Sequence, residues 1–422
     1  MNSAAVEEAK EAPDTQLKRT PILIAVALSI IAAGSYTTLA GLLTITFVEQ
    51  LGWSLSLISV GVSINMVLYG LTAPFSVFYM EKYGVRNVSV AALMVLVAGS
   101  FMCLMSNALI FTLSWGFLVG LGSGCLTMAY GALVARTWFP DAQGTVAGIL
   151  TASAVFGQFA LLPVWAEAIT LYGWRAPLIG CGLLAFVAIL VNYWFLSAER
   201  LGKHEDNFSN ITNRSVINVF STLFSVMGHR TFWILVALFL VCGATTNGLM
   251  WSHFTLASSD AGISATSASI VLLLIGVFNV FGTVFSGWLC DRISPRLILT
   301  FVFIARALTL LWLPLIFSSG FDTRLVAFGI IFGVLDVATV PPVIALCNRV
   351  FGQAGPSVFG WINAFHQIGA GAMALGGGLI RSSYGTYFGM WVLAGVLCVI
   401  AAVLVYASRY QSQDHRVATG SQ

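Results

Sequence analysis

Twelve apolar runs of about 20 residues decide what this chain can fold into, because a helix of about 20 residues crosses the ~30 Å hydrocarbon layer of a bilayer. Backbone groups in lipid must pair within a helix or a closed barrel, so runs of this length predict membrane-spanning helices. The predicted spans are approximately 21–47, 55–80, 88–106, 108–135, 145–168, 176–197, 231–256, 264–290, 297–318, 323–347, 358–380 and 387–408.

Composition agrees with an all-α integral membrane protein and excludes several other classes. The chain is 58% hydrophobic and 8% charged, whereas roughly a quarter of a soluble domain is charged. Its basic residues are scattered singly, so we expect no nucleic-acid partner. The seven cysteines fall within or beside apolar runs and never as Cys-x-x-Cys, so they are interpreted as small apolar residues. We expect no metal, no cofactor and no enzymatic activity, since His, Asp and Glu form no ligand or acid-base motif.

An internal duplication predicts two bundles of six helices. The segments 78–86 and 288–296 lie 210 positions apart, and each carries an acidic residue directly before a basic one. A second similarity, Tyr172-Gly173 and Tyr384-Gly385, has an offset of 212 positions. Equal offsets near half of the chain are typical of a parallel repeat. The predicted divisions are an N-terminal tail 1–20, a first bundle 21–197, a linker 198–230, a second bundle 231–408 and a C-terminal tail 409–422.

The distribution of lysine and arginine predicts the orientation, because these residues resist translocation across the membrane. Three arginines, Arg175, Arg324 and Arg381, lie on the side opposite to the termini, and Arg306 lies within a span. The other fifteen of the nineteen basic residues lie on the side of the N-terminus. We therefore expect both termini in the cytoplasm and the protein in the cytoplasmic (inner) membrane, as a monomer in the lipid bilayer.

The charged turn at 287–296 carries a family resemblance. Gly287, Asp291, Arg292 and Arg296 match the pattern Gly-x-x-x-Asp-Arg-x-Gly-x-Arg, with Ser294 at the second glycine. This pattern resembles the signature of the major facilitator superfamily, and the first copy matches it more weakly. The resemblance implies twelve transmembrane helices in two six-helix bundles, and a conformational latch on the cytoplasmic side formed by Glu81, Arg86, Asp291, Arg292 and Arg296.

Further motifs are similar to the bacterial branch of the monocarboxylate porter family. Trp138-Phe139-Pro140 follows the fourth span, and Trp361 leads to His366-Gln367-x-Gly369. The resemblance implies a secondary active transporter for proton-coupled uptake of a small organic acid, with protons and a small-molecule substrate as partners. The chain departs from the family at Asn279 and Thr283, where relatives carry an acid and an arginine. This departure favours an alternative function, the import of a neutral or aromatic metabolite or of a vitamin such as riboflavin. A membrane sensor on the same fold is the third hypothesis.

Three ionisable residues are predicted at mid-membrane, where each costs on the order of 2.5 to 3.5 kcal/mol. Asp336, His366 and Arg306 are therefore the proton-coupling candidates. Pro341 and Pro342 would break the helix after Asp336 and free backbone carbonyls. The alternative for Asp336 and Arg306 is a structural ion pair, and the alternative for His366 is packing. His253 is expected at the membrane interface.

Uncharged polar residues at corresponding depths of the first and seventh spans predict a cargo site at the interface between the repeats. Single polar residues also bridge helices, which is the alternative for each one. The substrate-binding candidates are Tyr36, Thr37, Asn65, Tyr69, Tyr130, Gln158, Thr246, Asn247, Asn279, Trp361, His366 and Gln367.

Overall fold

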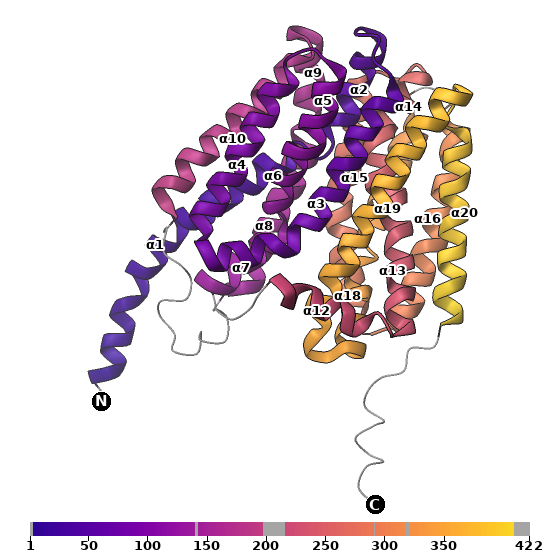
Figure 1. The fold of residues 1–422 in the computed structure, drawn as a ribbon. Coiled ribbons are helices and arrows are strands. Elements are labelled where there is room, and N and C mark those ends of the chain that lie inside the picture. The colour runs from indigo at the N-terminus through magenta and orange to yellow at the C-terminus, as the bar shows by residue number, and fades with distance from the viewer. Residues whose placement is uncertain (1–2, 140–141, 197–215, 291, 318–320, 409–422) are drawn as a thin grey trace, which may run out of the picture.

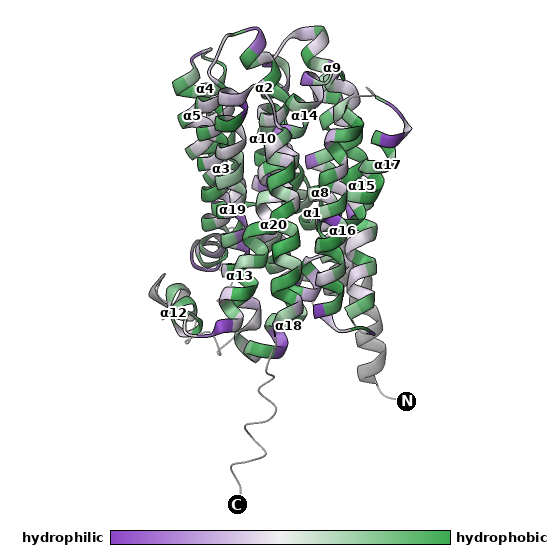
Figure 2. Cartoon of the chain, turned by 90° about the vertical axis from the view of Figure 1, so that its right-hand side faces the viewer, coloured by the Kyte–Doolittle hydropathy of each residue, from purple (hydrophilic) through white to green (hydrophobic). Residues whose placement is uncertain are grey.

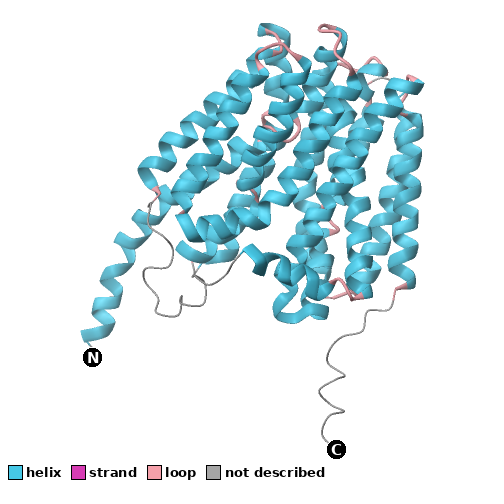
Figure 3. Cartoon of the chain, viewed as in Figure 1, coloured by secondary structure: helices cyan, strands magenta, loops and turns pink. Residues whose placement is uncertain are grey.

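A computed structural model describes residues 3–139, 142–196, 216–290, 292–317 and 321–408. Within these ranges the regular structure is helical (Figure 3). The N-terminal half contains α1 (Ser3–Gly34), α2 (Leu39–Glu49), α3 (Leu55–Tyr83), α4 (Val85–Cys103), α5 (Ala108–Leu113), η1 (Ser114–Val119), α6 (Gly120–Cys125), α7 (Met128–Trp138), α8 (Gln143–Val155), η3 (Phe156–Ala160), α9 (Leu162–Tyr172) and α10 (Arg175–Phe195). The C-terminal half contains α12 (Val216–Val226), α13 (Arg230–Gly243), η5 (Ala244–Trp251), α14 (Ser252–Asp260), α15 (Ala265–Cys290), α16 (Pro295–Phe317), α17 (Thr323–Asp336), α18 (Val340–Phe351), η6 (Gly352–Ala354), α19 (Gly355–Tyr384) and α20 (Phe388–Ala407).

The helices confirm the predicted spans. Eleven helical segments of the described chain are long and apolar enough to cross a membrane, such as Leu55–Tyr83 and Ala265–Cys290. The predicted eleventh span is also a helix, α19, but it is not among these eleven. Its glycines and its polar residues, which include His366 and Gln367, lower its hydropathy. It packs against α3 and α13 inside the molecule, so it needs less apolar surface than a helix that faces lipid.

The two halves form two bundles that stand side by side (Figure 1). The first and last described segments lie at the same end of the molecule. We name this end the terminal face and the other end the opposite face. Hydrophobic residues predominate along the helices (Figure 2), and large ones such as Phe186, Leu308 and Val403 are exposed on the flanks. Such a flank needs lipid around it rather than water, which accounts for the composition.

Three spans contain a π-helical turn, a feature that the sequence did not predict. The turns are η1 in the fourth span, η3 in the fifth and η5 in the seventh. A π-turn carries one extra residue and redirects the side chains that follow it, and such turns are frequent at functional sites. All eight residues of η5 are buried. This turn therefore sets the direction of the polar run Thr245–Asn247.

Glycines allow the close packing of α6 that the sequence indicated. A Cβ atom on Gly120 would lie 2.9 Å from Asn65 Cα, and one on Gly124 would lie 2.8 Å from the Tyr69 carbonyl oxygen. Because these distances are shorter than any real Cβ contact, only glycine fits at both positions. The glycines of α6 thus bring this helix against α3 within the N-terminal bundle.

The two bundles meet mainly in the half of the molecule away from the termini. A Cβ atom on Gly41 would lie 2.9 Å from the Ser252 carbonyl oxygen, and one on Gly371 would lie 2.9 Å from that of Ser63. Gly276 of α15 faces the ring of Phe159 in the same way. Glycines on both bundles therefore close the opposite face. On the terminal face, the linker helix α12 inserts Phe220 between the rings of Phe75 and Trp361, with centroid distances of 5.5 and 5.4 Å.

Candidate functional site

The tenth span is broken in the middle, and the break carries the centre of the candidate site. α17 ends at Asp336 and α18 begins at Val340, with Pro341 and Pro342 in its first turn. The last carbonyl groups of α17 have no helical N–H partners, because the helix ends at Asp336. Arg306 of α16 donates from Nη2 to the carbonyl oxygens of Leu335 and Asp336, both at 2.5 Å. A guanidinium group thus caps the C-terminus of α17, where the helix dipole favours positive charge.

The side chain of Asp336 is fully buried and its two oxygens differ in their surroundings. Oδ2 accepts a hydrogen bond of 3.2 Å from Asn279 Nδ2 on α15. Oδ1 is buried without a hydrogen-bond partner. The indole of Trp251 at the end of η5 interacts with the carboxylate, although Trp251 Nε1 makes no hydrogen bond of regular geometry. Asp336 therefore has one oxygen fixed by an amide and one oxygen free to accept.

Arg306 and Asp336 are neighbours, but Arg306 does not form the side-chain ion pair predicted from the sequence as the structural alternative. The guanidinium group reaches the main chain of Asp336 rather than its carboxylate. Arg306 Nη1 donates to Cys242 Sγ at 3.2 Å, and Nε is buried without a partner. Both residues are 0% exposed, so the opposite charges attract each other through a medium of low dielectric constant.

Cys242 connects Arg306 and Asp336 to His366. The sequence interpretation treated the cysteines as small apolar residues and missed this connection. Its thiol contacts Thr339 Oγ1 at 3.3 Å and Arg306, and it also interacts with His366. The His366 ring packs edge-on against Phe239, with centroids 5.6 Å apart, and its Nδ1 has no hydrogen-bond partner. The only sequence signal for Cys242 was its place one helical turn before the polar run of the seventh span.

The structure brings together the predicted cargo residues of the C-terminal half. Asn247 Nδ2 donates to Gln367 Oε1 at 3.3 Å and so joins η5 to α19. Thr246 Oγ1 donates to the Cys242 carbonyl oxygen at 2.8 Å. Asn279 belongs to the Asp336 site. Trp361 is buried on α19 closer to the terminal face, next to Phe220. These residues come from three spans, the seventh, the eighth and the eleventh, and Asn279 contacts Asp336 at the break in the tenth span.

The predicted cargo residues of the N-terminal half contact mainly their own bundle. The Tyr36 hydroxyl lies 2.5 Å from Ser100 Oγ, and Asn65 Nδ2 donates to the Trp115 carbonyl oxygen at 2.8 Å. Tyr130 is fully buried. Tyr36, Asn65, Tyr130 and the half-buried Tyr69 of α3 thus all belong to the N-terminal bundle.

Gln158 and Thr37 lie where the first and fifth spans change direction. Gln158 belongs to η3, and its carbonyl oxygen accepts a hydrogen bond of 2.6 Å from Thr38. Its Nε2 is buried without a partner. Thr37 is half-buried in the turn between α1 and α2. Phe159, the next residue after Gln158, meets Trp251 edge-on across the bundle interface at 5.5 Å.

The predicted latch residues lie at the terminal face and contact their own bundles. Glu81 forms a 3.0 Å ion pair with Arg136, a partner that the sequence pattern did not indicate. The Arg86 guanidinium lies 5.2 Å from the Tyr193 ring, and that of Arg292 lies 3.9 Å from the Trp288 ring. Arg296 donates to the Tyr406 carbonyl oxygen. Asp291 lies outside the described residues.

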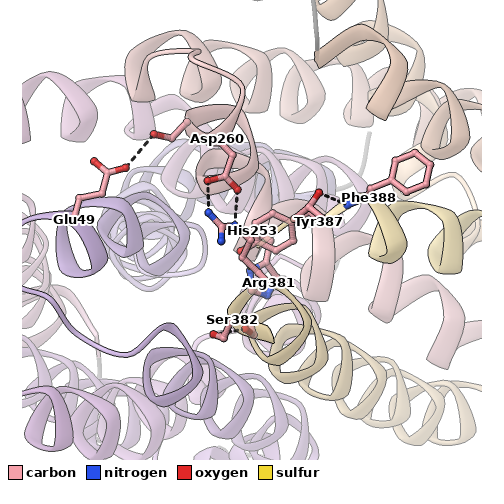
Figure 4. A network of polar contacts seen from close by, with 10 residues as sticks. Glu49, His253, Asp260, Arg381, Ser382, Tyr387 and Phe388 are labelled. Carbon is pink, nitrogen blue, oxygen red and sulfur yellow. Dashed lines mark hydrogen bonds and ion pairs between the residues drawn. The ribbon is translucent and has the colours of Figure 1, made fainter. Parts of the chain in front are cut away.

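A second polar network joins the bundles at the opposite face (Figure 4). Arg381 at the end of α19 forms a bidentate ion pair with Asp260 at the end of α14, with both contacts at 2.7 Å. The residues next to this pair reach the other bundle. Ser259 donates to Glu49 Oε1 at 3.5 Å, and Ser56 donates to Ser382 Oγ at 3.1 Å. These contacts accompany the glycine contacts that close this face.

His253 is buried in α14, close to the network of the opposite face (Figure 4). Its exposed fraction is 3%. Nε2 lies 2.8 Å from the Ala374 carbonyl oxygen, which can only accept, so Nε2 donates. Nδ1 then accepts from the Tyr387 hydroxyl at 2.9 Å. His253 is therefore a neutral imidazole that ties the seventh, eleventh and twelfth spans together.

Two helical bundles with apolar flanks and with buried polar groups at broken spans are typical of integral membrane transporters. The sequence matches the Major Facilitator Superfamily over residues 25–371 and 245–421. The chain belongs to this family, and it is a transporter of the major facilitator type, which confirms the resemblance seen in the sequence.

Similar proteins agree with this assignment. The uncharacterized MFS-type transporter YcxA of Bacillus subtilis is 28% identical over 368 residues, which cover 83% of each chain. Monocarboxylate transporter 12-B of Danio rerio is 23% identical over 321 residues, 69% of this chain and 66% of the relative. The fold is similar to that of the xylose transporter XylE from E. coli in a partially occluded inward open conformation, with a TM-score of 0.69 at 14% identity over 94% of this chain and 98% of that chain.

Proposed function

We propose that the chain is a secondary active transporter that couples the uptake of a small organic acid to proton entry. The single observation that carries the proposal is the buried Asp336 carboxylate with one unpartnered oxygen beside a capped helix break. A carboxylate buried in a membrane span is costly unless it is paired or protonated. Asp336 is the proton carrier in this proposal, Arg306 is its fixed positive neighbour, and His366 is a second candidate on the same network.

Unpartnered donors support a carboxylate cargo. Gln158 Nε2 and Arg306 Nε are buried without acceptors. Buried polar groups in native proteins are normally hydrogen-bonded, so each such donor calls for a ligand or a water molecule. A carboxylate only accepts hydrogen bonds, and protonated Asp336 would add one more donor. This balance favours an anion that enters together with a proton, and the word monocarboxylate in the name of one relative agrees with it.

The closed opposite face supports alternating access. If the terminal face is cytoplasmic, as the distribution of basic residues predicts, the face at which glycine contacts close the bundles is the outer one. The latch residues of the terminal face, among them Glu81 and Arg296, would then pair across the bundles in the opposite conformer. We retain the predicted divisions, the cytoplasmic (inner) membrane and a monomer as parts of the proposal.

A neutral or aromatic cargo such as riboflavin is the second candidate, and one observation favours it. Asn279 and Thr283 occupy the positions where relatives carry charges, and Thr283 donates to Asn279. The interface nearby is aromatic, because Phe159 and Trp251 meet across it. A planar ring fits between such groups.

Proteoliposomes with an acidic exterior separate these candidates. We expect labelled lactate to accumulate above its equilibrium level and to leave again when a protonophore is added, whereas labelled riboflavin does not accumulate. Accumulation of riboflavin alone would reject the organic acid. Exchange of lactate without any accumulation under the gradient would reject proton coupling while keeping transport.

A further inference from the structure

We propose that Asn279, held in place by Thr283, positions the Asp336 carboxylate so that its proton binds at Oδ1. Asn279 is thus a positioning residue that sets how tightly the site holds a proton. The inference rests on the proposed function, since it gives a role to the carboxylate that this function uses. It makes a prediction that needs no knowledge of the cargo.

The orientation of the Asn279 amide follows from its partners. An ionised carboxylate only accepts hydrogen bonds, so the amide group that faces Asp336 Oδ2 at 3.2 Å must be the NH₂ group. The amide oxygen then faces the Thr283 hydroxyl at 3.2 Å, which donates to it and to the Asn279 carbonyl oxygen at 2.8 Å. Thr283 lies one helical turn after Asn279. The amide therefore cannot rotate without losing a partner at each end.

The two carboxylate oxygens consequently differ in their readiness to bind a proton. Oδ2 already accepts from Asn279, and an O–H group at this atom would compete with that donor. Oδ1 has no partner, so a proton taken from water forms an O–H bond there without displacing any contact. An N–H donor on the carboxylate stabilises the ionised form. Removal of the Asn279 amide should make the site hold its proton up to higher pH.

The other described groups around Asp336 make no hydrogen bond of regular geometry to its carboxylate oxygens. Arg306 of α16 contributes positive charge through the main-chain cap, and Cys242 of α13 contributes a titratable thiol. Trp251 of η5 and Asn279 of α15 do not titrate. Asn279 is thus the one described side chain that donates to the carboxylate, and its replacement leaves the buried charges in place.

Infrared difference spectroscopy of the protein in lipid tests this inference without cargo. A pH titration follows the C=O stretch of a protonated carboxyl group, and Asp336→Asn identifies the band that belongs to Asp336. We expect the midpoint of this band to rise by about one pH unit in Asn279→Leu, the tenfold effect of losing one hydrogen bond to a charged group. Thr283→Val should raise the midpoint by less, because the Asn279 amide remains but loses its hydrogen bond from the Thr283 hydroxyl.

Ser286→Ala is the matched control on the same helix. Ser286 donates to the Ala338 carbonyl oxygen at 2.6 Å, next to Asp336 but without contact to its carboxylate, so the midpoint should not move. A midpoint that is unchanged in Asn279→Leu overturns the inference. A band that persists in Asp336→Asn, or a wild-type spectrum without such a band, overturns it as well. The proposed function fails separately, in the gradient-driven uptake assay.

Discussion

In the N-terminal bundle, the described side chains that are both polar and buried are uncharged, and many of them bond to main-chain carbonyl groups of their own helices. Asn192 is an example, since it donates to Ser29 Oγ and to the Ala188 carbonyl oxygen at 2.6 Å. The C-terminal bundle, with the same helical plan, buries Asp336 and Arg306. Two halves with one fold therefore differ in the electrostatics of their interiors. We infer that the N-terminal bundle acts as a neutral wall and that the C-terminal bundle carries the proton chemistry.

Removal of the buried cation should have the largest effect on stability. Arg306→Met leaves the Asp336 charge and two carbonyl groups without their partner, and a broken buried charge arrangement costs about 3 to 5 kcal/mol. Asn192→Leu in the neutral bundle should cost about 1 to 2 kcal/mol, because Ser29 and Ser89 also bond to main-chain carbonyls of their own helices. Thermal unfolding of the purified variants measures both losses.

A double variant sharpens this comparison. Arg306→Met with Asp336→Asn removes both charges, so it should recover part of the stability that Arg306→Met alone loses. Equal losses for Arg306→Met and Asn192→Leu would contradict the distinction between the bundles. A double variant less stable than Arg306→Met would show that the Asp336 charge is not what the arginine compensates.

The interface between the bundles gives the next test. A methyl group on Gly276 would overlap the Phe159 ring, so Gly276→Ala should push the bundles apart at the opposite face. Overpacking of this kind costs about 1 to 3 kcal/mol, enough for a roughly tenfold shift between conformers. A cysteine introduced at Ser382 should then react faster with a membrane-impermeant thiol reagent. Gly389→Ala is the control, because a Cβ atom there meets nothing within 4 Å; equal labelling in both variants would reject the closed interface.

The smallest effect is expected at the other end of the helix that carries Asp336. Asp322 caps the start of α17: Oδ1 accepts from the main-chain N–H groups of Arg324 and Leu325, and Oδ2 accepts from Arg324 Nε at 2.7 Å. The Arg324 guanidinium holds the pKa of the Asp322 carboxyl below its usual value. A lowered pKa means that the stabilisation is present above the ordinary pKa of about 4 and is lost as the pH falls through the lowered value.

Asp322→Asn should therefore lower the melting temperature slightly at neutral pH, since asparagine still caps the helix but carries no charge. The difference from the wild type should shrink as the pH falls below about 4. Melting curves over this range measure it. A difference that grows on acidification would give the opposite sign and would contradict the role of Arg324.

The fold could be predicted from the sequence because the number and length of apolar runs depend only on local composition. The candidates Asp336, Arg306 and His366 could be found for a similar reason, since a charged or titratable residue in a membrane span is costly wherever it points. The contacts that these residues make could not be predicted from the sequence. The sequence allowed an ion pair between two side chains, whereas Arg306 binds main-chain carbonyl groups at the end of α17.

Cys242 and Trp251 were missed because they are apolar by residue type, and only their direction makes them part of the site. A span that is apolar on all sides has no periodicity that fixes its rotation, and the π-turn η5 changes this rotation between the two residues. The same argument applies to Tyr36, whose hydroxyl binds Ser100 in its own bundle. Arg136 was missed as a partner of Glu81 because the two lie 55 residues apart in different spans.

Gradient-driven uptake by Asp336→Asn tests the central claim most directly. In proteoliposomes with an acidic exterior, this variant should fail to accumulate labelled lactate while it still exchanges lactate in counterflow at equal pH, because a permanently neutral side chain carries no proton but leaves the cargo path intact. Asp322→Asn, the same substitution at the exposed end of α17, should accumulate lactate like the wild type. Accumulation by Asp336→Asn at the wild-type level would show that the proton travels elsewhere.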